Sequence, residues 1–201
     1  MSTSPTGLRE RKKAKTRAAI REHAMRLFEE QGFAATTVEQ IAEAAEVSPS
    51  TFFRYFPAKE DVVLVDDVDA VLVQAIRAQP ADVAPIEAIV RALRDVFANM
   101  DPETWAWERR RQKLVLGVPE LRARMMHQMT GAIDLMAEVI GERAGLPPDD
   151  FSARVTAGAA VGVMMAALPA ARLTSGEGVT PDDHRRVLHA LTLLQQGLPL
   201  G

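Results

Sequence analysis

Hydrophobic residues recur along this chain at helical intervals almost throughout, and alternation with a period of two is absent. Ile20, Ala24, Leu27 and Phe28 stand at i, i+4, i+7 and i+8, which places them on one face of a helix. We expect that helix over residues 9–31. The pattern therefore predicts an all-α fold.

The segment 36–45 predicts a second, shorter helix. The hydroxyl groups of Thr36 and Thr37 can accept hydrogen bonds from free amides of a first helical turn, and a Glu or Gln follows each of them three residues later. An apolar stripe then continues at helical spacing through Val38, Ile41, Ala42 and Ala45.

A third helix is predicted in the stretch VSPSTFFRYFPAKED, which is short and unusually aromatic. Ser48 can cap its start, Pro49 is tolerated at the first helical position because it lacks an amide hydrogen, and Pro57 ends it. The gap of about three residues after the second helix is the spacing of a helix-turn-helix. Phe52 and Phe56 are i, i+4 partners and are expected to face inward.

The outward face of this third helix has the chemistry of a DNA-recognition helix. Arg54 can form two hydrogen bonds with guanine, and Phe53 or Pro49 can contact a thymine methyl group in the major groove. The remaining candidate DNA contacts are hydroxyl groups and one cation: Thr37, Ser48, Ser50, Thr51, Tyr55 and Lys59. The alternative is a small helical subdomain whose exposed aromatic helix docks on another protein.

Charge is distributed unevenly in a way that favours a polyanion as the partner of the N-terminal part. The 201-residue chain has a net charge of −3, yet residues 1–28 hold eight Lys and Arg against two acidic residues. The chain has no cysteine, which fits a reducing compartment, and we expect a cytoplasmic protein. With no phosphate-binding loop, no G-x-S-x-G and only four scattered histidines, an enzyme is not expected.

The segment TTVEQIAEAAEVSPSTFFRYFPAKEDV, with AMRLFEEQGF before it, resembles the N-terminal domain of the TetR family of transcriptional regulators over residues 16–63. The resemblance implies a DNA-binding domain, here 1–58, and a helical ligand-binding and dimerisation domain, here 59–201. It also implies that Thr37, Tyr55 and Lys59 contact DNA phosphates. The family usually has glycine in the turn, where this chain has Glu46, so the turn either differs from the usual one or absorbs the strain of a left-handed glutamate. The third helix is also similar to a subgroup that senses acyl-CoA-like ligands.

Two helices of the second domain are candidates for a dimer interface. Gly158 and Gly162, among several alanines, allow close approach of a neighbouring helix, and the last helix carries Leu188 and Leu191. Together these two helices resemble the four-helix dimer interface of the TetR family, which implies a homodimer whose two recognition helices lie about one DNA turn, roughly 34 Å, apart. The alternative is that they form the core of a monomer.

An effector cavity is expected in the same domain, because thioethers and aromatic rings line adaptable apolar pockets. The candidate wall residues are Phe97, Met100, Trp105, Trp107, Met125, Met126, Met129, Met164 and Met165. Each of them could equally be ordinary core. Arg109 and Arg110 belong to a basic run that is either a solvated surface or a contact for the phosphates of a CoA-like ligand.

No metal site, cofactor or membrane span is expected. Asp66, Asp67 and Asp69 are too close together for a calcium loop, and His184 and His189 miss the i, i+4 spacing of a metal pair. The apolar run 155–171 is short for a membrane span and contains a proline, so a buried helix is expected. The predicted mechanism is release of a repressor from a palindromic operator by a small apolar or amphipathic effector, acting through a fourth helix that begins near Lys59.

Overall fold

The computed structural model describes residues 5–65, 67–167 and 180–199, and these residues form helices without strands. The all-α prediction is therefore confirmed for the described residues. The chain divides into two compact units, Met1–Val65 and Asp66–Gly201.

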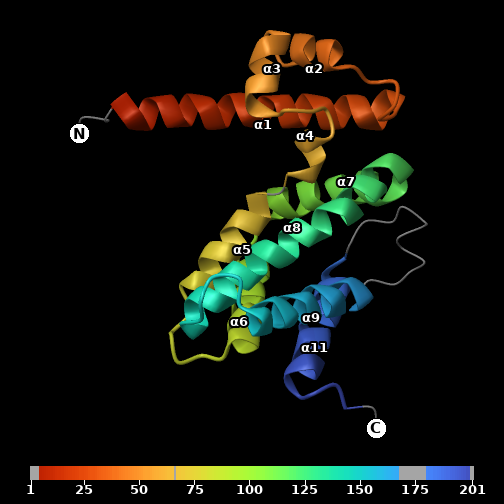
Figure 1. The fold of residues 1–201 in the computed structure, drawn as a ribbon. Coiled ribbons are helices and arrows are strands. Elements are labelled where there is room, and N and C mark those ends of the chain that lie inside the picture. Colours follow the sequence, from red (N-terminus) through yellow and green to blue (C-terminus); the bar gives the residue numbers. More distant parts are fainter. Residues whose placement is uncertain (1–4, 66, 168–179, 200–201) are drawn as a thin grey trace. The chain divides into compact units, whose positions relative to one another are not determined.

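The first unit is a small bundle built on one long helix. It contains α1 (Pro5–Gln31), α2 (Val38–Ala44), α3 (Pro49–Tyr55) and the single turn α4 (Asp61–Leu64). Figure 1 shows α2 and α3 beside α1, with the N-terminal turns of α1 extending past them. The side chains that fill this bundle are fully or nearly fully buried: Ile20, Ala24, Met25, Phe28, Phe33, Ile41, Ala42, Phe52, Phe56, Val62 and Val63.

The end of α1 is fixed by the residues that follow it. Gly32 adopts a left-handed backbone (φ +87°), and its amide donates to the carbonyl of Phe28 at 3.0 Å. Thr36 is buried, and its hydroxyl donates to the carbonyls of Gly32 at 2.9 Å and Leu27 at 3.3 Å. Because a buried hydroxyl needs a partner, these bonds set the path of the chain into α2.

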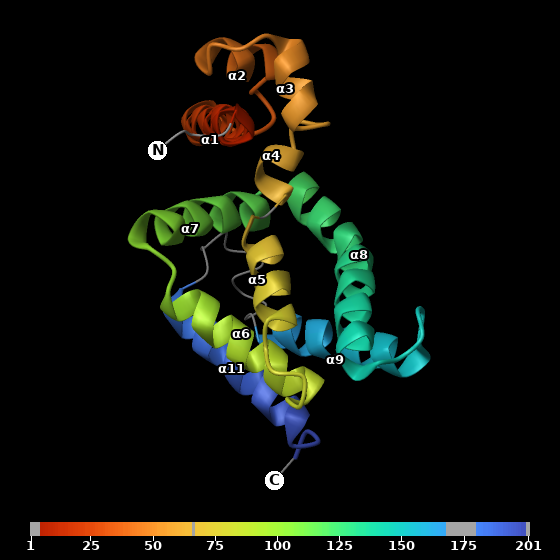
Figure 2. The same ribbon diagram turned by 90° about the vertical axis from the view of Figure 1, so that its left-hand side faces the viewer.

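The second unit contains longer helices. They are α5 (Asp67–Arg77), α6 (Pro85–Ala98), α7 (Pro102–Gly117), α8 (Pro119–Ala144), α9 (Phe151–Ala167) and α11 (Pro181–Gln195). Four of them begin with proline, which has no amide hydrogen to leave unsatisfied at the first helical position. Figure 2 shows α6 lying along α11. The C-terminal end of α8 meets α9.

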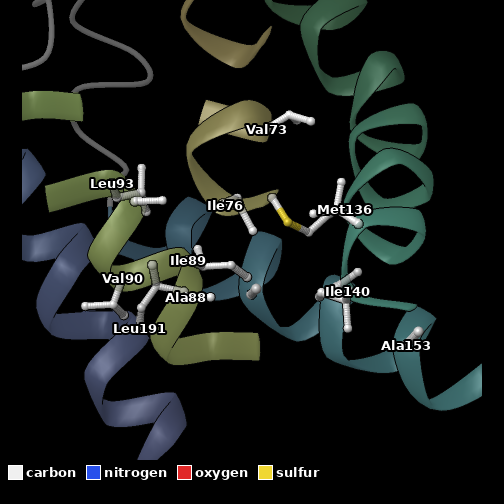
Figure 3. Close-up of a cluster of buried hydrophobic side chains, with 14 residues drawn as sticks. Val73, Ile76, Ala88, Ile89, Val90, Leu93, Met136, Ile140, Ala153 and Leu191 are labelled. Carbon is white, nitrogen blue, oxygen red and sulfur yellow. The ribbon is translucent and has the colours of Figure 1, made fainter. Parts of the chain in front are cut away.

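The core of the second unit draws apolar side chains from α5, α6, α8, α9 and α11. Figure 3 shows the buried side chains of this cluster. Its centre holds large residues from α5, α6, α8 and α11 that are fully excluded from solvent: Ile76, Ile89, Val139 and Leu191. On α9 the buried positions are mostly small, including Ala153, Ala157 and Ala160. Small side chains let α9 lie close to α8 and α11.

Arg143 near the end of α8 holds the loop that follows α5. Its guanidinium donates to the carbonyls of Ile76 at 3.1 Å, Gln79 at 2.9 Å, Pro80 at 2.7 Å and Val83 at 3.1 Å. These carbonyls lie at and beyond the end of α5, where the helix itself provides no donor for them. One long side chain thus caps a helix and orders the loop leading to α6.

One prediction about the helices was wrong. A single fourth helix beginning near Lys59 was expected, but the structure has the short α4 and then a separate α5. The break is at Val65, whose extended backbone (φ −81°, ψ 111°) is incompatible with a continuous helix. Within the described ranges, no helix is long and apolar enough to cross a membrane.

Candidate DNA-recognition helix and effector region

The turn between α2 and α3 is a Schellman motif built on a glutamate. The amide of Glu46 donates to the carbonyl of Glu43 at 3.0 Å, and that of Val47 donates to the carbonyl of Ala42 at 2.9 Å. Glu46 has φ +54°, a left-handed conformation that costs a side-chain-bearing residue about 1–2 kcal/mol. Of the two alternatives for this turn, the structure shows the second: the usual turn is kept and Glu46 takes the strained left-handed conformation.

The capping hydroxyls of both short helices are in the expected places. Thr37 accepts from the amide of Gln40 at 3.2 Å, while the side chain of Gln40 accepts from the Thr37 amide at 2.9 Å, which completes the capping box. Ser48 accepts from the amide of Thr51 at 3.1 Å and contacts the hydroxyl of Ser50 at 2.9 Å. These contacts fix the starts of α2 and α3 and leave Thr37, Ser48 and Ser50 exposed.

The two faces of α3 divide as the spacing predicted. Phe52 and Phe56 are buried, with ring centroids 5.8 Å apart, and they anchor the helix to the core. Phe53 remains 50% exposed, and Arg54 and Pro49 are also exposed. An aromatic ring and a guanidinium projecting from a short, anchored helix can reach base edges in a major groove.

Lys59 has a structural role that the sequence did not indicate. Its Nζ donates to the carbonyls of Phe33 at 2.8 Å and Thr36 at 2.9 Å, and it lies 4.1 Å from the centroid of the Phe33 ring. An ammonium group has three donors, so one N–H remains for another acceptor. The phosphate contact of Lys59 stays a prediction. The same side chain also holds the segment between α1 and α2 in place.

In the second unit, the structure brings two of the candidate effector residues together. The rings of Phe97 on α6 and Trp105 on α7 have centroids 6.0 Å apart, and His184 on α11 packs against them at 4.0 Å and 4.7 Å. Burial lowers the pKa of His184, although the carbonyl of Thr180, 2.9 Å from Nδ1, acts in the opposite direction. No local sequence signal predicts this cluster, because its members are far apart in the chain.

The other candidate wall residues are only partly buried. Met164 packs against the same core as Phe97. Met126 is exposed, and half-buried positions are held by Met100, Trp107, Met125, Met129 and Met165. Their assignment to an effector cavity stays a prediction.

The basic run on α7 is divided by a buried ion pair. Arg111 and Glu108 are joined at 2.7 Å, and their side chains are only 11% and 8% exposed. Arg109 is exposed and Arg110 is half-buried. Glu108 was not singled out in the sequence, although its i, i+3 spacing from Arg111 is the available signal.

The four predicted interface residues differ in their accessibility. Leu191 is fully buried in the core of its own unit, so it offers no surface to a partner. Leu188 is half-buried, whereas Gly162 is exposed and Gly158 is partly exposed. A Cβ atom added to either glycine would meet nothing within 4 Å.

Among the residues that the structure describes, no group of three or more His, Cys, Asp or Glu side chains could hold a metal ion. Asp66 of the acidic trio lies outside the described residues.

Comparison with known proteins identifies both units. Residues 20–65 match the model of bacterial regulatory proteins of the tetR family, and residues 83–197 match the MftR C-terminal domain. The transcriptional regulator TcmR of Streptomyces glaucescens is 36% identical over 151 residues, which cover 72% of this chain and 67% of TcmR. MftR of Mycobacterium tuberculosis is 27% identical over 170 residues, covering 78% and 80% of the two chains. The structure also resembles Thermus thermophilus FadR, a TetR-family transcriptional repressor crystallised with lauroyl-CoA, with a TM-score of 0.55, 29% identity and coverage of 92% and 96%.

Proposed function

Because the chain belongs to the TetR family of bacterial regulatory proteins, and is a transcriptional regulator rather than an enzyme, we propose that it represses transcription by binding a palindromic operator as a homodimer and is released by a small effector. The observation that carries this proposal is the α2–α3 pair, in which buried Phe52 holds exposed Phe53 and Arg54 on the outer face.

The recognition helix uses two kinds of base contact. Arg54 donates to O6 and N7 of a guanine, and Phe53 packs on a thymine methyl group. The capping hydroxyls of Thr37, Ser48 and Ser50, together with Thr51 and Tyr55, position the helix through phosphate contacts. Each good base contact contributes about 1–3 kcal/mol of discrimination, so loss of Arg54 should relax the operator sequence at one position.

The homodimer forms through α9 and α11. On α9 the residues Phe151, Val155, Gly158 and Gly162 follow helical spacing, and the first two are 77% and 52% exposed. Two large apolar residues exposed one turn apart on the same helix face form a patch, which favours a partner surface. Leu188 extends this surface on α11, whereas Leu191 is excluded from it by its burial.

Substitution of Gly162 tests the interface without loss of the fold. In a monomer, Gly162→Ala should be neutral or stabilising by up to about 1 kcal/mol, because alanine favours helix and the added Cβ meets nothing. In a dimer that needs close approach at this glycine, Gly162→Leu should weaken association. Sedimentation of the wild type and both variants measures this, and an unchanged dimer with Gly162→Leu would exclude this face.

The effector is apolar or amphipathic, and a CoA thioester of a fatty acid is the class that we favour. The support is the lauroyl-CoA held by the FadR relative, together with a second unit that carries Phe97, Trp105 and several half-buried methionines. We assign Arg109 and Arg110 on α7 to the phosphates of such a ligand, because a guanidinium can form forked hydrogen bonds with phosphate oxygens. Unchanged affinity for lauroyl-CoA after replacing both with alanine would exclude that role.

The test of DNA recognition is selection of bound sequences from a random duplex pool. It is run for the wild type and for a Phe53→Ala, Arg54→Ala variant. We expect the wild type to enrich a palindromic sequence and the double variant to lose that enrichment. If neither enriches any sequence at low salt, α3 is a protein-docking surface instead.

Effector release is tested on the selected operator. Lauroyl-CoA and free fatty acids are titrated into the complex, and a ligand that favours the DNA-free state must lower operator affinity. If no such ligand changes operator affinity, the sensing half of the proposal is wrong and the DNA-binding half is unaffected.

A further inference from the structure

A groove of about 630 Å³ lies within the first unit, between the N-terminal turns of α1 and the end of α3. Figure 1 shows these turns of α1 extending past α2 and α3. The groove is lined by Arg9, Glu10, Lys12, Lys13, Thr16, Arg54 and Tyr55. Its walls therefore carry four cations and a single carboxylate, and one of the cations belongs to the proposed recognition helix.

The cations of α1 that line the groove share one face of the helix. Arg9, Lys12 and Lys13 stand at i, i+3 and i+4, so their side chains project in one direction. Arg11 and Lys15 have the same i, i+4 spacing as Arg9 and Lys13 but lie on the opposite face and do not line the groove. The groove thus uses three of the eight Lys and Arg residues of this helix.

This charge pattern is unfavourable for the helix itself. The positive end of a helix dipole favours acidic side chains, yet the first turn of α1 has none. Arg9 and Lys13 are also like charges at i, i+4, which destabilises a helix by about 0.2–0.5 kcal/mol. Among the described residues, no acidic group forms an ion pair with the side chains of Arg9, Lys12 or Lys13. A bound polyanion would relieve both effects.

We propose that this groove binds the sugar–phosphate backbone of DNA beside the base pairs that α3 reads, an inference that rests on the proposed DNA-binding function. From Arg9 to Lys13 the helix rises about 6 Å, close to the axial rise of two nucleotide steps on one strand, about 3.4 Å each. Arg54 and Tyr55 make the groove continuous with the recognition helix, so a duplex on α3 is the polyanion that reaches it.

The lining residues contribute differently. The ammonium and guanidinium groups on α1 donate to phosphate oxygens, and the phenol of Tyr55 can donate as well. The hydroxyl of Thr16 donates to the carbonyl of Lys12 at 3.0 Å, so it is already used within the helix. Glu10 opposes binding, because its carboxylate repels phosphate.

The chain offers a matched pair of variants for the test. Arg9→Ala with Lys13→Ala removes one arginine and one lysine from the groove, and Arg11→Ala with Lys15→Ala removes the same groups at the same spacing from the other face. Affinity of each full-length protein for a 30-base-pair duplex containing the selected operator is measured from about 50 to 300 mM salt. The slope of log K against log salt reports the number of phosphates neutralised.

Loss of two phosphate contacts per chain should reduce that slope by about 2–4 in a homodimer, at about 0.9 per phosphate. The control pair should change it far less. Glu10→Gln should strengthen binding, an effect that damage to the fold would not produce. Far-UV circular dichroism of the free proteins verifies that each variant remains helical.

Equal slopes for the two double variants, or an unchanged slope for the groove variant, would overturn the groove assignment while leaving the proposed function intact. Wild-type protein that bound no duplex even at low salt would overturn both. Neutral methylphosphonate linkages at the phosphates protected by the wild type give a second readout. They should weaken the wild type by about tenfold or more and the groove variant much less.

Discussion

Replacing Lys59 with methionine separates its structural role from the predicted phosphate contact. Methionine keeps an apolar stem beside the Phe33 ring but removes both hydrogen bonds to main-chain carbonyls, which measure 2.8 and 2.9 Å. The carbonyl of Phe33 still accepts a hydrogen bond from the Thr36 amide at 3.3 Å. Removing the lysine donor therefore affects the carbonyl of Thr36 more. A hydrogen bond from a charged donor contributes about 1.5–3 kcal/mol, and water can replace part of it at this half-buried site.

We therefore expect Lys59→Met to destabilise the first unit by about 2 kcal/mol, roughly thirtyfold in its opening equilibrium. Hydrogen exchange of amides in α1 and α2 measures this without DNA. Both tryptophans, Trp105 and Trp107, lie in the second unit, so their fluorescence during urea unfolding reports on that unit and serves as the internal control.

If Lys59→Met leaves amide protection in the first unit unchanged and lowers only DNA affinity, Lys59 has no structural role and acts at the phosphates alone. Lys59→Arg is the matched variant, because it keeps the charge while changing the shape of the donor. If the two carbonyl bonds matter, this variant should lose less stability than Lys59→Met.

Three further outcomes follow from local geometry. Glu46→Gly should raise the stability of the first unit by about 0.5–1 kcal/mol, because it relieves the left-handed strain. The greater freedom of glycine in the unfolded chain offsets part of this gain. Urea unfolding followed by hydrogen exchange measures the change. Arg143→Met should destabilise the second unit by about 3 kcal/mol, because several loop carbonyls lose their donor, and the urea midpoint of tryptophan fluorescence should fall. His184 has a lowered pKa, so below its ordinary value of about 6.5 the unfolded chain binds a proton that the folded chain does not, and stability should fall as pH drops from 6.5 toward the folded pKa. A His184→Gln variant should lose this part of the pH dependence, and an unchanged profile would contradict the assignment.

The sequence by itself determined the first three helices, the caps of α2 and α3 and the two faces of α3. These are local properties: a hydroxyl with Gln40 three residues after Thr37 makes a capping box, and a spacing of four places Phe52 and Phe56 on one side. The resemblance to the TetR family rests on the same local pattern and is confirmed by the matches to both units. The glutamate in the turn left the sequence undecided between a different turn and a strained one, and the structure shows a Schellman turn with Glu46 in the left-handed conformation.

Only the tertiary structure decided what distant residues do to one another. Lys59 reaches carbonyls 26 and 23 residues earlier in the chain, and His184 packs on rings from two other helices. Leu191 shares its helical spacing with Leu188 yet is wholly buried, because the surrounding helices, not the period, set which part of an apolar stripe meets solvent. Periodicity specifies the direction of a side chain on its own helix, whereas its partner depends on how the helices pack, and that information is spread over the whole chain.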